Sequence, residues 1–190
     1  MLQLFQFLNG IQPLEEELQA YLIGHLQHKR LEAGENWIRL GQVCSSVAFI
    51  EEGLVKSTYK RKGKSYIHWF LREQDVMIAV GSFFEQLPSR ETIVAIEPTS
   101  LYYIDFATFK HLFRRYESFQ WIAIILLTRY YMQSVDRTSL VRLLRSDRFL
   151  DFMRSEKELV PRLSQRDIAM YLGLSEEHLS RLRALLFPSV

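Results

Sequence analysis

The 190 residues can hold one large or two small domains, and 48% hydrophobic residues are enough to build a core for each. The formal net charge of +2 neither requires nor excludes a polyanionic partner, whereas the composition excludes a disordered chain. Cys44 is the only cysteine, which excludes an internal disulfide and a cysteine-ligated iron-sulfur cluster.

The N-terminus and the apolar runs carry no signal for secretion or membrane insertion. Residues 1–8 have no positive flank and no cleavage site, and they are too short for the usual signal peptide. The longest apolar run, residues 121–127, is far shorter than a membrane span. We therefore expect a cytoplasmic protein with no membrane partner.

A short leading helix followed by strands is expected up to about residue 109. Residues 14–25 have the apolar spacing of a helix. Gly53 is placed to turn between two strands, and Gly63 can take the positive φ of a hairpin tip. Short β-prone stretches, which at this spacing predict a barrel or roll, cover residues 37–40, 47–51, 54–59, 66–71, 76–80, 92–96 and 101–104.

Residues 116–144 contain no proline or glycine and predict one long helix. The helix has one broad stripe that is longer than a small domain needs to cover its own core, so it packs on the strands, on a second copy of the chain, or on both. The stripe comprises Trp121, Ile124, Ile125, Thr128, Tyr131, Met132 and Val135.

Basic residues are in excess between residues 110 and 148, just before the C-terminal motif described next. This excess suits either phosphate contacts that supply affinity without sequence information or a solvated helix face. The basic residues are Lys110, Arg114, Arg115, Arg129, Arg137, Arg142, Arg145 and Arg148, against Glu117, Asp136 and Asp147.

Residues 163–183 spell two short helices joined by a glycine-centred turn, which is the pattern of a helix-turn-helix. Ser164 is a good N-cap, with Asp167 three positions on as its capping-box partner. Gly173 lies where the first helix must end in a left-handed conformation. The apolar face of the first helix comprises Ile168, Ala169 and Leu172.

Ser175 is placed to cap the second helix, in which Leu179 and Leu182 face inward. A recognition helix presents its N-terminal side chains to base edges. The outward-facing candidates for DNA contact are Glu176, Glu177, His178, Ser180, Arg181 and Arg183, together with Ser175 at the cap. Ser164 and Gln165, at the start of the first helix, are better placed for phosphate. An ordinary helical hairpin is the alternative.

This stretch resembles the helix-turn-helix of the Crp/Fnr family of bacterial transcription regulators. The lead-in D-R-F-L-D-F-M and L-V-P-R-L agrees, and V-A-F-I-E-E-G-L-V-K and L-E-A-G-E resemble the hairpin and opening turn of a cyclic-nucleotide-binding β-roll. The resemblance implies an α+β fold in three parts: a sensor β-roll at residues 1–115, a dimerisation helix at 116–144 and a DNA-binding domain at 145–190.

The resemblance also implies partners. They are double-stranded DNA, a second copy of the chain, a small-molecule effector of unknown identity, and RNA polymerase. Dimerisation is physically sensible, because two linked recognition helices read two half-sites one DNA turn apart. The chain ends soon after Phe187, so we expect the β-hairpin wing of many family members to be missing.

A nucleotide-binding member of the family carries a phosphate cassette: a glycine-glutamate pair, a short helix, then an arginine followed by serine or threonine. Here Ser89 takes the place of the arginine and Arg90 that of the small hydroxyl, which turns the arginine to the opposite strand face. No Gly-Glu pair follows Gly81, and Glu85 lies too close to Ser89 for a helical turn between them.

We therefore expect no cyclic AMP binding in the family manner and no resident cofactor or metal. A different ligand could use a pocket with aromatic and polar walls, although such residues often only pack. The candidate pocket residues are Trp69, Phe83, Phe84, Glu85, Ser89, Arg90 and Thr128.

Base readout follows from the resemblance for Glu176, Glu177 and Arg181, with glutamate accepting from cytosine and arginine donating to guanine. No metal-ligand spacing, nucleophile elbow or phosphate loop is present, so catalysis is not expected. Two functions stay in contention: a sequence-specific transcription regulator, and a ligand- or protein-binding β-roll module whose helix-turn-helix is vestigial.

Overall fold

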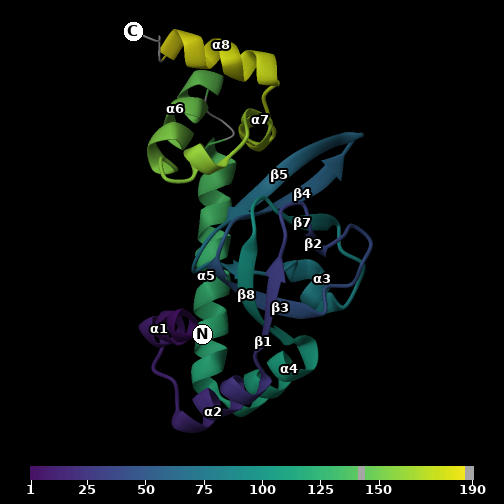
Figure 1. Ribbon diagram of the computed structural model, residues 1–190, viewed down its shortest axis with the longest axis vertical. Coiled ribbons are helices and arrows are strands. Elements are labelled where there is room, and N and C mark those ends of the chain that lie inside the picture. The colour runs from purple at the N-terminus through teal and green to yellow at the C-terminus, as the bar shows by residue number, and fades with distance from the viewer. Residues whose placement is uncertain (141–143, 187–190) are drawn as a thin grey trace.

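The structure is a computed structural model that describes residues 1–140 and 144–186. The described chain is α+β, with a β-roll flanked by helices and a helical C-terminal part (Figure 1). The helices are α1 (Leu2–Ile11), α2 (Glu16–His25), α3 (Val80–Glu85), α4 (Phe106–Arg115), α5 (Glu117–Leu140), α6 (Arg145–Ser155), α7 (Gln165–Leu172) and α8 (Glu176–Leu186), with a 3-10 turn at Val160–Arg162.

Two antiparallel sheets form the roll, in the strand orders β1-β8-β3-β6 and β2-β7-β4-β5. Side chains that alternate inward along these strands, among them Ile50, Val55, Ile93 and Leu101, fill the core between the sheets. The predicted roll is therefore confirmed. The strands are β1 (Gln27–Leu31), β2 (Asn36–Ile38), β3 (Ser46–Glu52), β4 (Val55–Arg61), β5 (Lys64–Leu71), β6 (Val76–Met77), β7 (Glu91–Ala95) and β8 (Thr99–Asp105).

Two glycines lie in turns between strands of the roll, as the sequence predicts. Lys62 and Gly63 have φ of 50° and 75° and make the two-residue connection between β4 and β5, which suits the twist of paired strands. Gly53 has a φ of 111°, and a Cβ atom there would lie 2.5 Å from Thr99 Oγ1 and 2.8 Å from the Pro98 carbonyl oxygen. Only glycine fits that position.

The structure contains elements that the sequence patterns do not predict, among them one helix and one strand near the N-terminus. Helix α1 precedes the expected leading helix, and strand β1 pairs with β8 from Gln27↔Tyr103 to Leu31↔Thr99. Strand β1 reads Q-H-K-R-L and buries only Leu31, because it lies at the edge of its sheet. Its polar outer residues hide the alternation that marks a strand.

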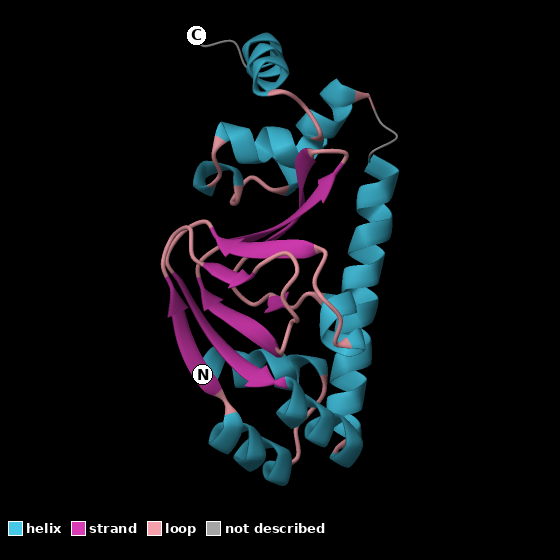
Figure 2. Ribbon diagram, turned by 90° about the vertical axis from the view of Figure 1, so that its right-hand side faces the viewer, coloured by secondary structure: helices cyan, strands magenta, loops and turns pink. Residues whose placement is uncertain are grey.

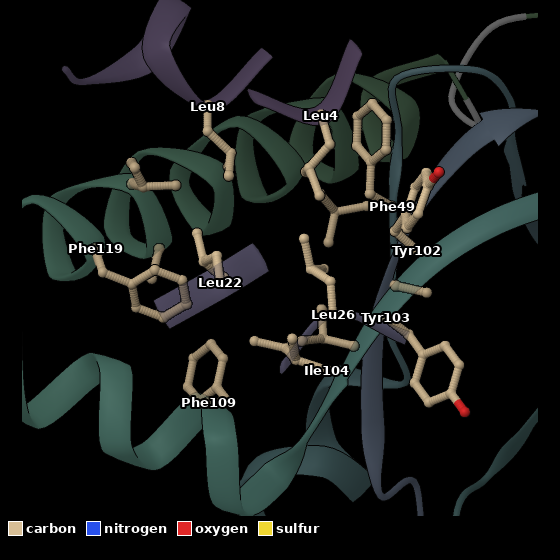
Figure 3. Close-up of a pocket in the computed structure, with 15 residues that line it drawn as sticks. Leu4, Leu8, Leu22, Leu26, Phe49, Tyr102, Tyr103, Ile104, Phe109 and Phe119 are labelled. Carbon is tan, nitrogen blue, oxygen red and sulfur yellow. The ribbon is translucent and has the colours of Figure 1, made fainter. Parts of the chain in front are cut away.

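Helices α1 and α2 close one end of the roll (Figures 1 and 3). Figure 3 shows Leu4 and Leu8 of α1 pointing into an apolar space toward Leu22 of α2 and Phe119 of α5. Only a cavity of about 90 Å³ remains there. This end of the molecule is therefore a packed core.

Helix α5 runs alongside the roll, as Figure 2 shows, and confirms the predicted long helix within the described residues. One face packs against the roll and the N-terminal helices through Phe119, Ile122, Leu126 and Tyr130. The Tyr130 hydroxyl accepts the Val76 N–H at 2.8 Å, which ties the helix to β6. None of the helices in the described ranges is long and apolar enough to cross a membrane.

Helices α6 to α8 build a second hydrophobic core, separate from that of the roll. Its buried residues are Phe149, Phe152, Ile168, Ala169, Leu172 and Leu179. The last residues of the chain and Arg142 lie outside the described residues, so the expectations about Arg142 and about a wing beyond Phe187 concern segments of which the structure gives no account.

Candidate nucleic-acid interface

Helices α7 and α8 form the helix-turn-helix that the sequence predicts. The Ser164 hydroxyl oxygen accepts the Asp167 N–H at 3.0 Å and caps α7. Gly173 ends α7 in the left-handed conformation, with a φ of 68°. The Ser175 hydroxyl oxygen accepts the His178 N–H at 3.2 Å at the start of α8. Each cap satisfies a backbone donor that the helix leaves unpaired.

Asp167 departs from the predicted capping box. Its N–H is capped by Ser164, but its carboxylate accepts a hydrogen bond from Lys56 Nζ of β4, at 2.6 Å. Asp167 is only 6% exposed, so the ammonium group of Lys56 compensates a buried negative charge. The side chain thus joins the helix-turn-helix to the roll.

Arg162, in the turn before α7, makes a second polar connection to the roll. Its guanidinium group donates to Glu73 at 2.8 and 3.0 Å and to Glu97 at 2.6 Å. Partial burial acts to raise the pKa of Glu73, but hydrogen bonds from Arg162 and from the Gly53 N–H outweigh it and lower the pKa to about 2. Glu73 therefore stays ionised at neutral pH and holds Arg162 in place.

Arg137 of α5 makes a third connection. Its guanidinium carbon lies 3.9 Å from the centre of the Tyr171 ring of α7, and it donates to the Ile67 carbonyl oxygen of β5 at 2.7 Å. The Tyr171 ring also contacts Phe70 of β5, with 4.9 Å between ring centres. Helix α7 is thus docked on the hairpin of β4 and β5, and Figure 1 shows α8 beyond it, at the end of the molecule farthest from α2.

The predicted DNA-contacting residues lie at the surface of the helix-turn-helix while α7 stays docked on the roll. Arg181 is exposed, and its Nε donates to the Glu177 carbonyl oxygen at 3.4 Å, within its own helix. The exposed candidates are Ser164, Gln165, Ser175, Glu176, Glu177, Ser180 and Arg181, and the half-buried ones are His178 and Arg183.

The basic residues that precede the motif are not gathered beside α8. Lys110, Arg114 and Arg115 lie on α4, which Figure 1 shows at the opposite end of the molecule. Arg137 and Arg148 donate to backbone carbonyl oxygens within the chain. The basic run in the sequence suggested a phosphate-binding surface, but Lys110, Arg114 and Arg115 lie far from α8 in the structure.

The outer face of α5 is apolar and exposed. Trp121, Ile124 and Tyr131 are 50%, 47% and 68% exposed, and Met132 and Leu127 are similarly accessible. We call these five residues the α5 stripe. Ile125 is half-buried, and Thr128 is exposed and donates its hydroxyl to the Ile124 carbonyl oxygen at 2.8 Å. Large apolar side chains exposed along one helix are typical of an interaction site.

The segment at the place of the family's phosphate cassette contains a short helix, α3. It runs from Val80 to Glu85, with Ala79 as its N-cap and Gln86 as its C-cap in the left-handed conformation, at a φ of 53°. No helix lies between Glu85 and Ser89, as the sequence predicts, because Glu85 is itself the last residue of α3. Helix α3 starts with neither glycine nor glutamate.

The position expected to hold the cassette's arginine is occupied by Ser89, which is 4% exposed. Its hydroxyl donates to the Glu91 carbonyl oxygen at 2.9 Å and accepts the Glu91 N–H at 3.1 Å. Arg90 is exposed. The carboxylate of Glu91 accepts a hydrogen bond from Ser57, and burial raises the pKa of Glu91 against the lowering effect of that bond. Ser89, Ser57 and Glu91 thus place hydroxyl groups and an acid where the cassette's arginine is expected, and the arginine of this region, Arg90, is the exposed residue next to Ser89.

The structure brings two of the candidate pocket residues, Trp69 and Phe84, to the wall of one cavity. Phe83 is fully buried and packs edge-to-face on Phe106 and Phe109. Glu85 is exposed at the end of α3. No cluster of three histidine, cysteine or acidic side chains that could hold a metal ion occurs in the part of the chain that the structure describes.

Comparison with known proteins identifies the architecture. Residues 28–116 match the family model of the cyclic nucleotide-binding domain. By sequence, no curated protein matches the chain at a significant level. Among solved structures, the c-di-GMP responsive global regulator CLP from Xanthomonas campestris has a TM-score of 0.75 at 15% identity, covering 90% of this chain and 91% of its own.

Two further structures show the same fold. FixK2 from Bradyrhizobium japonicum has a TM-score of 0.73 at 22% identity, covering 85% of this chain and 84% of its own. A protein assigned to the Crp/Fnr family, from Eubacterium rectale, has a TM-score of 0.73 at 15% identity and covers 91% of this chain and 83% of its own.

A roll of the cyclic nucleotide-binding domain type, followed by a long helix and a helix-turn-helix, defines a two-part architecture. The chain is Crp/Fnr-like: it combines this roll at residues 28–116 with the fold of the Crp/Fnr structures over nine-tenths of its length. The resemblance that the sequence motifs indicated is confirmed.

Proposed function

We propose that the chain is a sequence-specific DNA-binding transcription regulator that acts as a homodimer and does not bind cyclic AMP through a phosphate cassette. The observation that carries the proposal is the capped helix-turn-helix, whose α8 surface is exposed while α7 stays docked on the roll. Base edges would be read by Arg181, Glu177 and Glu176, and phosphate would be held at the start of α7.

DNA binding is tested by selecting genomic fragments on the purified protein and measuring affinity for the selected site across a salt series. A regulator that contacts phosphates must lose affinity steeply as salt rises. Binding that is absent even at low salt would favour the alternative module with a vestigial helix-turn-helix, which the two exposed glutamates at the start of α8 favour on charge grounds.

The homodimer is supported by the α5 stripe, which the roll leaves uncovered. Two such stripes in contact would bury large apolar side chains, at roughly 25 cal/mol for each Å² removed from water. Ile124→Arg should convert a dimer into a monomer in sedimentation velocity, whereas Gln133→Arg, at an exposed polar position of the same helix, should not. A monomeric unmodified chain at high concentration would refute this part.

The proposed failure to bind cyclic AMP is supported by Ser89 and Glu91, because a hydroxyl group and a partly buried carboxyl group offer the phosphate no counter-charge. Millimolar cyclic AMP or cyclic GMP should leave the melting temperature unchanged. A clear rise with either nucleotide would overturn this part and leave the DNA-binding and dimer tests unaffected.

A further inference from the structure

A cavity of about 470 Å³ lies between the roll, α3 and α5. Trp69 and Leu71 of β5 form one wall, and Leu126 and Tyr130 of α5 form the opposite wall. Phe84 of α3 lies at the same cavity. The volume falls within the usual range for small-molecule sites, roughly 300–1,000 Å³.

The walls carry no formal charge, since none of the described residues that line the cavity is lysine, arginine, aspartate or glutamate. The polar tip of Tyr130 is already used, because it accepts the Val76 N–H at 2.8 Å and donates toward Asp75 at 3.5 Å. Trp69 meets the Tyr130 ring edge-on, with 6.1 Å between ring centres. Apart from the hydroxyl groups of Tyr131 and Ser134, the cavity therefore offers aromatic and aliphatic surface.

This chemistry selects against charged ligands. Moving an ion into such a space without a counter-charge costs several kcal/mol, whereas apolar and aromatic ligand surface gains free energy on leaving water. Rings gain further from offset or edge-on contact with Trp69 and Tyr130. A cyclic nucleotide, with its phosphate charge, is a poor match to these walls.

We propose that this cavity binds an uncharged small molecule with one or two aromatic rings. The inference rests on the proposed function only in assigning that molecule the role of effector; the binding itself depends on the cavity alone. Leu127 and Tyr131 line the cavity and also belong to the α5 stripe. An occupant would therefore touch the same helix face on which the homodimer is proposed to form.

The test uses two dyes with one ring skeleton. N-phenyl-1-naphthylamine is uncharged and becomes fluorescent in apolar sites, and 1-anilinonaphthalene-8-sulfonate adds a single negative charge. The full-length protein should bind the uncharged dye saturably, one molecule per chain, and at least about tenfold more tightly than the sulfonate.

Two variants should fill the cavity from opposite walls, Ala123→Phe from α5 and Ile78→Trp from the roll. A variant that keeps the circular dichroism and cooperative melting of the unmodified chain should bind the uncharged dye at least about tenfold more weakly. Met132→Arg is the matched control, because Met132 lies on the α5 stripe and does not line the cavity. That variant should keep the dye even as a monomer.

Three outcomes would overturn the proposal: no saturable binding of the uncharged dye, equal affinity for both dyes, or loss in Met132→Arg with retention in a folded cavity-filling variant. The third would place the dye on the exposed stripe. DNA binding is measured separately on the same samples, so a protein that binds the dye and not DNA would refute the proposed function and leave the cavity assignment standing.

Discussion

Arg181 is the side chain on which base recognition should depend most. It is exposed on α8, and its Nε donates to the Glu177 carbonyl oxygen inside its own helix. We expect Arg181→Ala to weaken binding to the preferred site by about 1 to 3 kcal/mol and to relax specificity there. A mobility-shift assay measures this, with Arg39→Ala on the roll surface as the control. Equal affinity of the two variants would contradict the role.

Glu91 should make stability depend on pH. Burial raises its pKa, so its contribution to stability is present below the ordinary value of 4.5 and is lost as pH rises through the raised pKa. Glu91→Gln should therefore raise the melting temperature at neutral pH and give little gain well below pH 4.5. Thermal melts at both conditions check this, and an equal gain at both would show that ionisation plays no part.

Sequence reasoning at single residues was best where the cause is local. Ser164, Gly173 and Ser175 take their predicted capping roles because each depends only on neighbours within a few positions. The partner of Asp167 could not be predicted in the same way, because Lys56 lies 111 positions away and meets it only after the domains pack. The roles assigned to the DNA-contacting and pocket residues remain predictions.

The tightest turn of the roll gives a prediction at the scale of an element. Gly53 combines a positive φ with contacts that a Cβ atom would bring below 3.0 Å. Gly53→Ala should cost about 3 kcal/mol or more of unfolding free energy, from backbone strain and overpacking together. Gly63→Ala is the control: it has a φ of 75° in open space, so strain alone applies and the loss should be about 1 to 2 kcal/mol. Denaturant titration measures both.

Elements with a clear pattern of apolar residues in the sequence were predicted, and elements without such a pattern were not. Strand β4 alternates buried and half-buried residues over its first four positions, β3 has a run of three buried residues, and α5 is uninterrupted by proline or glycine. Strand β1 is polar, and its identity comes from pairing with β8. Helix α3 is a single short turn, set by the packing of Phe83 rather than by any apolar repeat.

At the scale of the molecule, Arg162 should control how firmly the helix-turn-helix is held. Arg162→Ala would leave Glu73 and Glu97 without their shared cation. Spin labels at Lys60→Cys and Lys157→Cys should show a narrow distance distribution in the parent and a broad one in the variant. Arg72→Ala is the control, because its contact with Glu158 is long, at 3.7 Å, and exposed. An equally narrow distance distribution in Arg162→Ala would refute this role of Arg162.

The same spin labels test how the docking of the helix-turn-helix on the roll depends on pH. The pKa of Glu73 falls from 4.5 to about 2 when it is paired, so the pair stabilises docking above pH 4.5 and this stabilisation is lost as pH falls toward 2. The distance distribution should therefore broaden across that interval. This arrangement of roll and helix-turn-helix lay beyond sequence reasoning, because the residues that join them, Arg162, Lys56 and Arg137, belong to no local pattern.

The Lys56–Asp167 pair has a consequence for how this sequence can diverge. Because Asp167 is 6% exposed and its partner ammonium lies 2.6 Å away, reversing either charge alone would place like charges together in a confined space. Two sites 111 positions apart are therefore expected to mutate as a unit. Lineages descended from this chain should show paired exchange or paired loss of the two charges, and single replacements should be rare among them.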